Sequence, residues 1–267
     1  MTYFPSMRFL TRFRAPKPTF SSPLAPGEPF FAIGDIHGCD HLMPGLLERI
    51  DEIYARQQDQ HEARNGAPWS ARLVFVGDYV DRGDQSAAVL HRLQALQRDH
   101  PSTLCLMGNH EQMLLQFLDT PGESGPRWMR YGGLQTMASF GVAPPAATAP
   151  ADKWEEARDR FRTALGAPTE AWLRALPLIW QTGNVIVVHA GADPARPPAK
   201  QSEATLLWGH SDFTSTPRTD GLWVVHGHTI VEQPRPEMGR LPVDTGAYAT
   251  GRLTAALISP GKVEFTP

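Results

Sequence analysis

The segment Leu73-Val74-Phe75-Val76-Gly77-Asp78-Tyr79-Val80-Asp81-Arg82-Gly83 joins a short apolar run to a polar signature. The run has about the length of a buried strand. The glycine that follows it permits a sharp turn from strand to loop, so that a carboxylate leaves the end of the strand. This order of strand, glycine and polar side chain indicates an α/β sheet with chemistry at its strand ends.

The same order recurs at four other places along the chain. The signatures are Gly34-Asp35-Ile36-His37-Gly38, Gly108-Asn109-His110-Glu111, His189-Ala190-Gly191 and Gly227-His228-Thr229. The apolar runs before them occupy residues 30–33, 104–107, 185–188 and 222–225. Because ligands collect at strand ends in open α/β sheets, we expect all five ends to converge on one site. One signature alone is a weak signal, whereas five in order are specific.

Apolar residues at helical spacing fill the intervals between the first signatures. They occur over residues 46–54, over residues 89–96 and from residue 109 onward. Strand followed by helix, repeated, is typical of an α/β fold. The strand rhythm stops at about residues 120–181, which we interpret as a helical insertion in one domain spanning residues 28–267. The tail at residues 253–265 alternates like part of a second sheet, with a turn at Pro260-Gly261.

Composition bounds the class of protein. The 267 residues are 41% hydrophobic and 20% charged, which is ordinary for a soluble globular chain. A formal net charge of −3 provides no general basic field, so we expect no nucleic-acid partner. Two cysteines exclude a disulfide scaffold, and no apolar stretch approaches the about 20 residues of a membrane span. The apolar core of a signal peptide is also missing, so the expected location is the cytoplasm.

Residues 1–27 form a basic, proline-rich leader in this interpretation. Arg8, Arg12, Arg14 and Lys17 precede the first acidic residue of the chain. With the phenylalanines between them, they are compatible with a weak membrane-surface or partner-binding tail. The prolines of this stretch break any long amphipathic helix, and this favours a frayed leader ahead of the first strand.

The side chains of the signatures suit hydrolysis of a phosphate ester with two divalent cations. Such cations, about 3.5–4 Å apart, activate a water and neutralise phosphoryl oxygens. We expect Asp78 to bridge them. Asp35 and His37 complete the ligands of one cation, and Asn109, His189 and His228 complete those of the other. Oxygen and nitrogen ligands without a thiolate favour Mn, Fe or Zn over Mg or Ca, and we expect Mn.

Asp81 and His110 remain once the metal ligands are assigned. A carboxylate beside an imidazole orients the ring and keeps it protonated near neutral pH. His110 is therefore the expected general acid for the leaving group, with Asp81 as its orienting partner. Arg82 offers a planar fork to two phosphoryl oxygens. The alternative for Arg82 is a surface ion pair.

At these residues the chain resembles the phosphoprotein phosphatase family of calcineurin-like metallophosphoesterases, in the short bacterial branch that includes the phage lambda enzyme. The resemblance covers residues 30–258, and Asp81-Arg82-Gly83 separates this family from the wider group. It implies an α/β/β/α sandwich with a dinuclear site at one end. Three further stretches resemble bacterial members but supply no ligand that we can name: Tyr131-Gly132-Gly133, Leu206-Leu207-Trp208 and Val243-Asp244-Thr245-Gly246-Ala247-Tyr248.

One departure from the family pattern concerns phosphate binding. The family usually places a second phosphate-binding arginine two positions after a tryptophan, where Trp208-Gly209-His210 has histidine. Histidine loses its charge above about pH 6.5, so we expect His210 to bind phosphate in a pH-dependent way. Arg130 is a candidate for the missing charge, with an exposed helix position as its alternative. His226 offers a second imidazole near His228, and the family pattern selects His228.

The leading functional prediction is a serine/threonine protein phosphatase that acts on phosphorylated proteins or peptides. The nearest alternative is a hydrolase of diadenosine tetraphosphate or of another nucleotide, because the family contains such enzymes with the same ligands. A binding scaffold without catalysis is a third reading, which the presence of all the expected ligands and of the acid pair disfavours. The oligomeric state stays open.

Overall fold

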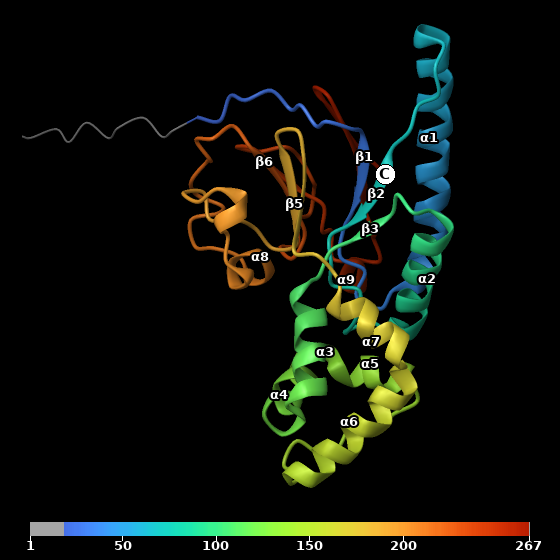
Figure 1. Ribbon diagram of the computed structural model, residues 1–267, viewed down its shortest axis with the longest axis vertical. Helices are drawn as coiled ribbons and strands as arrows, with labels where there is room; N and C mark the ends of the chain where they lie inside the picture. The colour runs from blue at the N-terminus through green and yellow to red at the C-terminus, as the bar shows by residue number, and fades with distance from the viewer. Residues whose placement is uncertain (1–18, 267) are drawn as a thin grey trace, which may run out of the picture.

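The structure, a computed structural model, describes residues 19–266 and contains two β-sheets (Figure 1). The first sheet has the strand order β3-β2-β1-β8-β9. Its strands are β1 (Phe30–Ile33), β2 (Arg72–Phe75), β3 (Leu104–Cys105), β8 (Ala255–Ser259) and β9 (Lys262–Phe265). The first three strands run parallel, with Phe30 opposite Arg72, and β8 joins β1 antiparallel. The carboxyl ends of β1, β2 and β3 therefore lie at one edge.

The second sheet has the strand order β4-β5-β6-β7. Its strands are β4 (Ile179–Thr182), β5 (Val185–Val188), β6 (Trp223–His226) and β7 (Arg240–Pro242). The last three strands are parallel, and β4 pairs antiparallel with β5 as a hairpin. Strands β5 and β6 thus also end side by side, which sets their following loops next to each other.

Alternation along the strands divides the core into layers. Phe30 and Ala32 pack with Val187 and Val225 between the two sheets. Phe31, the neighbour of both in β1, belongs instead to the cluster on the outer face of the first sheet. This period of two is the expected behaviour of a strand that is buried on both faces. The predicted α/β/β/α sandwich is confirmed.

Helices cover the outer face of each sheet (Figure 1). Helices α1 (Met43–Asn65) and α2 (Ser86–Asp99) bury Met43, Leu46 and Val89 against the first sheet. The shorter α8 (Glu203–Trp208) buries Leu206 against the second sheet, together with Phe213 from the loop that follows. Short helical turns η1 (Asp40–Leu42), η3 (Pro198–Lys200) and α9 (Ala247–Thr250) lie in the connections.

Most of the stretch predicted as a helical insertion, at about residues 120–181, forms a helical lobe below the sheets in Figure 1, whereas its end belongs to strand β4, which begins at Ile179. The lobe follows α3 (Asn109–Asp119) and contains α4 (Pro121–Trp128), η2 (Met129–Gly133), α5 (Leu134–Ser139), α6 (Ala151–Leu165) and α7 (Ala167–Arg174). Buried aromatic rings pack these helices together. The ring centre of Phe117 in α3 lies 5.0 Å from that of Trp128 and 6.1 Å from that of Phe161. The lobe therefore packs directly on α3, the helix whose first residue is Asn109 of the third signature.

Two parts of the chain lie elsewhere than expected. The tail strands β8 and β9 extend the first sheet rather than a second one, because Ala255–Ser259 pairs along β1. Residues 19–27 of the expected leader pack on the second sheet, where Phe20 meets the Trp223 ring at 5.0 Å and Leu24 is buried. The four basic residues of the leader lie outside the described residues. Among the described residues no helix is long and apolar enough to cross a bilayer.

Candidate active site

Loops after five strands bring the predicted polar residues together. Asp35 and His37 follow β1, Asp78 follows β2, and Asn109 opens α3 just beyond β3. His189 and His228 follow β5 and β6. Three of these residues have left-handed backbones, with φ of 47° at His37, 54° at Asp78 and 63° at His228. Non-glycine residues seldom adopt that conformation, and its clustering is typical of functional sites.

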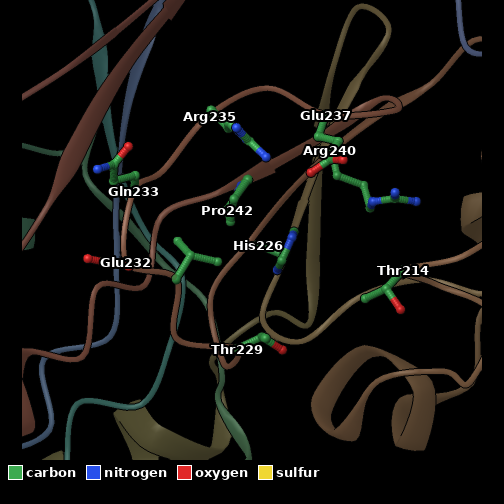
Figure 2. A pocket seen from close by; sticks show the side chains of 10 residues that line it. Thr214, His226, Thr229, Glu232, Gln233, Arg235, Glu237, Arg240 and Pro242 are labelled. Atoms are coloured by element: carbon green, nitrogen blue, oxygen red, sulfur yellow. The ribbon is translucent and has the colours of Figure 1, made fainter.

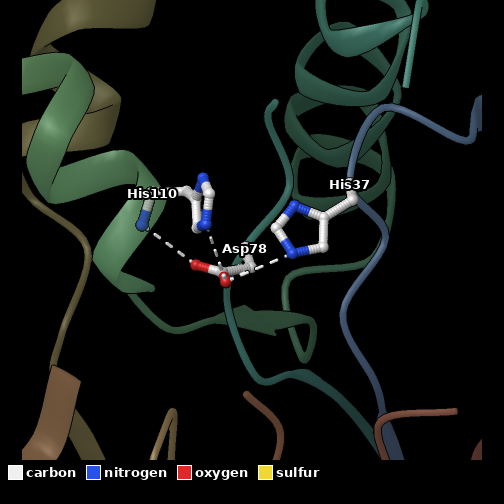
Figure 3. A group of neighbouring side chains, drawn as sticks. All are labelled: His37, Asp78 and His110. Atoms are coloured by element: carbon white, nitrogen blue, oxygen red, sulfur yellow. Dashed lines mark hydrogen bonds and ion pairs between the residues drawn. The ribbon is translucent and has the colours of Figure 1, made fainter. Parts of the chain in front are cut away.

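Asp78 lies at the centre of the group (Figure 3). Its Oδ2 is 3.4 Å from His37 Nε2, and its Oδ1 is 3.3 Å from His189 Nε2. Burial alone would raise the pKa of Asp78, but His189, His110 and His37 lower it well below its ordinary value. The carboxylate is therefore ionised and presents one oxygen to each side of the cluster, as a bridging ligand does.

Two groups of ligand atoms share this carboxylate. His37 and His110 form one group with Asp78, and His189 and His228 form the other. Backbone carbonyls set the orientation of two of the rings, because His37 Nδ1 donates to Val80 O and His189 Nδ1 donates to Val76 O. In both rings the Nε2 lone pair is thus turned toward Asp78, as second partners of metal-binding histidines arrange it.

Asn109 supplies an amide oxygen to the second group. Its Oδ1 is 2.9 Å from His189 Nε2 and 2.9 Å from His228 Nδ1. Burial lowers the pKa of His189, but the charge and hydrogen bond of Asp78 help to raise it above its ordinary value. Without a metal, an Nε2 proton therefore fits between these atoms, and a bound cation would take the place of that proton. The arrangement suits a cation held by Asp78, Asn109, His189 and His228.

Asp35 lies beside the cluster but belongs to neither group of ligand atoms. One of its oxygens accepts a hydrogen bond from His228 N at 2.9 Å, whereas the other is buried without a hydrogen-bond partner. Burial raises the pKa of Asp35 well above its ordinary value, and the neighbouring carboxyls of Asp244 and Asp78 raise it further. A cation would satisfy the unpaired oxygen and favour its ionised form. The residues present therefore fit two divalent cations, without showing which metal they bind.

His110 and Asp81 form the expected buried pair beside the cluster. His110 Nδ1 is 2.6 Å from Asp81 Oδ2. Burial lowers the pKa of His110, but Asp78 and Asp81 outweigh that effect and raise it above its ordinary value. The raised pKa favours the protonated ring, whose Nε2 lies 3.9 Å from Asp78 Oδ2. This is the orientation that a general acid needs.

Sequence reasoning missed the residues that hold this pair. Trp128 Nε1 donates to both oxygens of Asp81, at 3.1 and 2.9 Å, and Thr136 Oγ1 donates to one of them at 2.6 Å. Both donors come from the helical lobe, and both are fully buried. No motif marks them, since a tryptophan and a threonine in helices usually contribute to packing alone. The lobe therefore fixes the carboxylate that orients His110.

Glu111 and Asp244 are two further buried carboxyls that the motifs contained without an assigned role. Glu111 accepts hydrogen bonds from the backbone nitrogens of Asp78, Tyr79 and Val80, at 2.7–3.2 Å. It thus holds the loop that carries Asp78. Asp244 accepts from Gly246 N at 2.7 Å and lines the cavity beside the cluster, where burial raises its pKa to about 6.

A cavity of about 210 Å³ opens over the cluster. Arg82 and Tyr248 line it together: an Arg82 nitrogen donates to the Tyr248 hydroxyl, and the guanidinium lies 4.5 Å from the centre of the Tyr248 ring. No carboxylate is paired with Arg82 in the described part of the chain. The alternative for Arg82, a surface ion pair, is thus not formed, and its side chain lines the cavity instead.

The structure does not bring His210 to this cavity. Its Nε2 is 3.8 Å from Asp193 Oδ2, and its Nδ1 accepts from Asp212 N at 3.2 Å. Arg130 is exposed and does not line the cavity either. His226 points from β6 into a separate cavity of about 510 Å³ that Arg235, Arg240 and other side chains surround (Figure 2). It is not part of either ligand group.

Comparisons with known proteins give independent information. A family profile described as "Calcineurin-like phosphoesterase" matches residues 28–232. Two similar proteins are both named bis(5'-nucleosyl)-tetraphosphatase PrpE (asymmetrical). The one from Bacillus velezensis is 29% identical over 83% of this chain and 86% of its own. The one from Geobacillus thermodenitrificans is 30% identical over 84% of this chain and 87% of its own.

Solved structures with the same fold include both predicted activities among their names. A proposed diadenosine tetraphosphatase matches with a TM-score of 0.57 and 21% identity, over 92% of this chain and 98% of its own. A protein serine/threonine phosphatase from Saccharomyces cerevisiae matches with a TM-score of 0.51 and 17% identity, over 90% of this chain and 80% of its own. At these identities the likeness concerns the fold.

Proposed function

Because the chain belongs to the calcineurin-like phosphoesterase family, we propose that it hydrolyses bis(5'-nucleosyl) tetraphosphates asymmetrically, with two divalent cations. The observation that carries the phosphohydrolase part is Asp78, whose Oδ2 faces the imidazole of His37 and whose Oδ1 faces that of His189. The substrate rests on the curated relatives, which match over most of both chains.

The relatives favour the second of the two activities that the sequence suggests. They are named as nucleotide hydrolases, whereas the protein phosphatase among the solved structures is similar in fold alone. The serine/threonine protein phosphatase prediction therefore becomes the alternative. The two activities share the same phosphate chemistry and differ in what flanks the phosphate.

In this proposal the residues around the cavity bind the substrate phosphate. Two divalent cations bound here would polarise a water for attack and neutralise phosphoryl oxygens. Arg82 adds a planar cation at the cavity wall, where it is free of any carboxylate among the described residues and can donate to two oxygens of the same phosphate. His210, which lies outside the cavity, takes no part in this arrangement.

Proton transfer falls to His110. Water adds to the phosphorus, the bond to the bridging oxygen breaks, and His110 Nε2 gives its proton to the departing phosphate oxygen. Asp81 keeps the opposite ring nitrogen engaged at 2.6 Å and stabilises the protonated ring until the transfer. The proton released by the attacking water restores the imidazolium afterwards. Such acid catalysis is commonly worth about 100-fold or more in rate.

The function is tested by the specificity constants of the manganese-loaded protein for diadenosine tetraphosphate and for a phosphothreonine peptide. We expect kcat/KM for the dinucleotide to exceed that for the peptide by at least about ten-fold. A higher value for the peptide would overturn the proposed substrate and restore the protein phosphatase. Absence of turnover with both, in protein that binds metal, would contradict the phosphohydrolase itself.

A further inference from the structure

Aromatic side chains surround the mouth of the catalytic cavity. Tyr131, Trp208 and Tyr248 all line it, and each comes from one of the three stretches to which the sequence analysis gave no role. Large apolar side chains usually avoid water, yet Tyr131 is 41% exposed and Tyr248 is 37% exposed. Exposed rings gathered at the opening of a polar site are typical of a place where a ligand binds.

Tyr131 and Trp208 are connected by Arg127. The guanidinium of Arg127 lies 5.9 Å from the Tyr131 ring centre and 5.0 Å from that of Trp208. Trp208 is further held by its Nε1, which donates to Gln112 Oε1 at 2.9 Å. Within the described residues the Arg127 side chain has no carboxylate partner. The result is an aromatic wall with an unpaired positive charge beside it.

The wall stands on the side of the general acid. The Tyr131 ring centre is 6.4 Å from that of His110, whereas Tyr248 lies on the other side, 5.2 Å from His37. The cavity of about 210 Å³ is smaller than the roughly 300–1,000 Å³ of sites that enclose a drug-sized ligand. The cavity has room for a phosphate group, and the nucleoside part of a nucleotide must therefore lie outside it, against the side chains at its mouth.

We propose that Tyr131 and Trp208, with Arg127 beside them, form the subsite for the nucleobase next to the cleaved phosphate. The inference rests on the proposed function. A tetraphosphate bridge cut off-centre is broken next to an end phosphate, so that one of the two phosphates at the cleaved bond carries a nucleoside directly. On the side of the general acid this is the departing nucleoside monophosphate, which takes its proton from His110. Its base must lie at the mouth of the cavity, where stacking on an aromatic ring is favourable for any base. The charge of Arg127 suits the phosphates that remain outside.

Calorimetric binding to the full-length, manganese-loaded protein tests this, with adenosine 5'-monophosphate and inorganic phosphate as probes. We expect the wild type to bind the nucleotide more tightly than phosphate. Tyr131→Ala weakens nucleotide binding about ten-fold, within the range known for base stacking, and changes phosphate binding less than about two-fold. Tyr131→Phe, which keeps the ring, binds as the wild type does.

Leu134→Ala is the matched control, since Leu134 is 50% exposed in the same lobe but does not line the cavity. Equal affinity of the wild type for both probes, or equal weakening of both by Tyr131→Ala, would overturn the subsite. These titrations require no turnover. A failure of the proposed function gives a different result: the wild type would bind adenosine 5'-monophosphate but would not cleave diadenosine tetraphosphate.

Discussion

Thr136→Val removes one hydroxyl from the lobe and tests whether the lobe positions the general acid. In the wild type, Thr136 Oγ1 donates to Asp81 Oδ1 at 2.6 Å and accepts from Asp81 N at 2.8 Å. Valine has nearly the same shape, so packing is retained while both hydrogen bonds are lost. Ser86 Oγ, at 3.1 Å, still accepts from Asp81 N, but its own bond to Thr136 Oγ1, at 3.0 Å, is lost as well. The net loss is one hydrogen bond to a carboxylate and one between two hydroxyls.

The expected loss in the free energy of unfolding follows from the lost hydrogen bond between Thr136 and the Asp81 carboxylate. A hydrogen bond to a charged group contributes about 1.5–3 kcal/mol to stability. At about 2–4 °C per kcal/mol for a large domain, that corresponds to a fall in Tm of about 3–12 °C. Calorimetry or circular dichroism measures it. Thr163→Val, on the exposed side of α6, is the control and should change Tm by less than about 2 °C.

The same substitution should alter the pH dependence of activity. Burial raises the pKa of Asp81, and the hydrogen bonds from His110, Thr136 and Trp128 oppose that rise. Without Thr136 the pKa of Asp81 rises further, its negative charge weakens, and the pKa of His110 falls. We expect kcat to decline at a lower pH than in the wild type, with KM unchanged. A superimposable pH profile together with an unchanged Tm would refute the positioning role.

Three further predictions concern the ligands, His210 and the metal-free protein. Asn109→Ala should bind less metal than the wild type, measured by atomic emission, and its kcat should fall at least about ten-fold. Full metal content together with wild-type turnover would show that Asn109 is not a metal ligand. His210→Ala should keep kcat/KM within about two-fold of the wild type in steady-state assays, because the wild-type His210 ring lies beside Asp193. A ten-fold loss would indicate that His210 contacts the substrate. The metal-free protein should become less stable between about pH 7 and 8, because burial raises the pKa of Glu111 to about 7 and Asp78 helps to raise that of His110. The buried rings of His37, His226 and His228, whose pKa values burial lowers to about 3 or 4, are largely neutral in both the folded and the unfolded state above pH 7 and do not oppose this trend. Glu111 and His110 hold protons in the folded state that the unfolded chain has released, so Tm measured in chelator falls with pH, and a rising Tm would contradict this.

The signatures allowed the polar side chains of the cluster to be predicted as neighbours, and their role as metal ligands stays a prediction. Asp35, His37 and Asp78 were placed correctly near one another because each follows a strand of the same parallel sheet, whose carboxyl ends must coincide. His189 and His228 follow strands of the other sheet. The expectation that all five strand ends converge extended a rule for one open sheet to both sheets, and the structure shows that the second sheet does end beside the first, since His189 Nε2 lies 3.3 Å from Asp78 Oδ1.

The supporting residues could not be predicted, for a physical reason. Trp128 and Thr136 reach Asp81 from 47 and 55 residues away, through helices whose arrangement depends on packing. Their local sequence resembles that of any amphipathic helix. His210 was misplaced for the opposite reason, because position relative to Trp208 was taken to fix its direction, whereas its ring turns to Asp193. Similarly, the pairing partner of β8 depends on the whole sheet and not on its own alternation.

Chromatography of the products from diadenosine tetraphosphate tests the central claim most directly. The account predicts equal amounts of ATP and AMP from the manganese-loaded protein, and no products from Asp78→Asn, in which the shared carboxylate has become an amide. Two molecules of ADP per substrate would contradict asymmetric cleavage. Wild-type rates in Asp78→Asn would contradict the two-cation site itself.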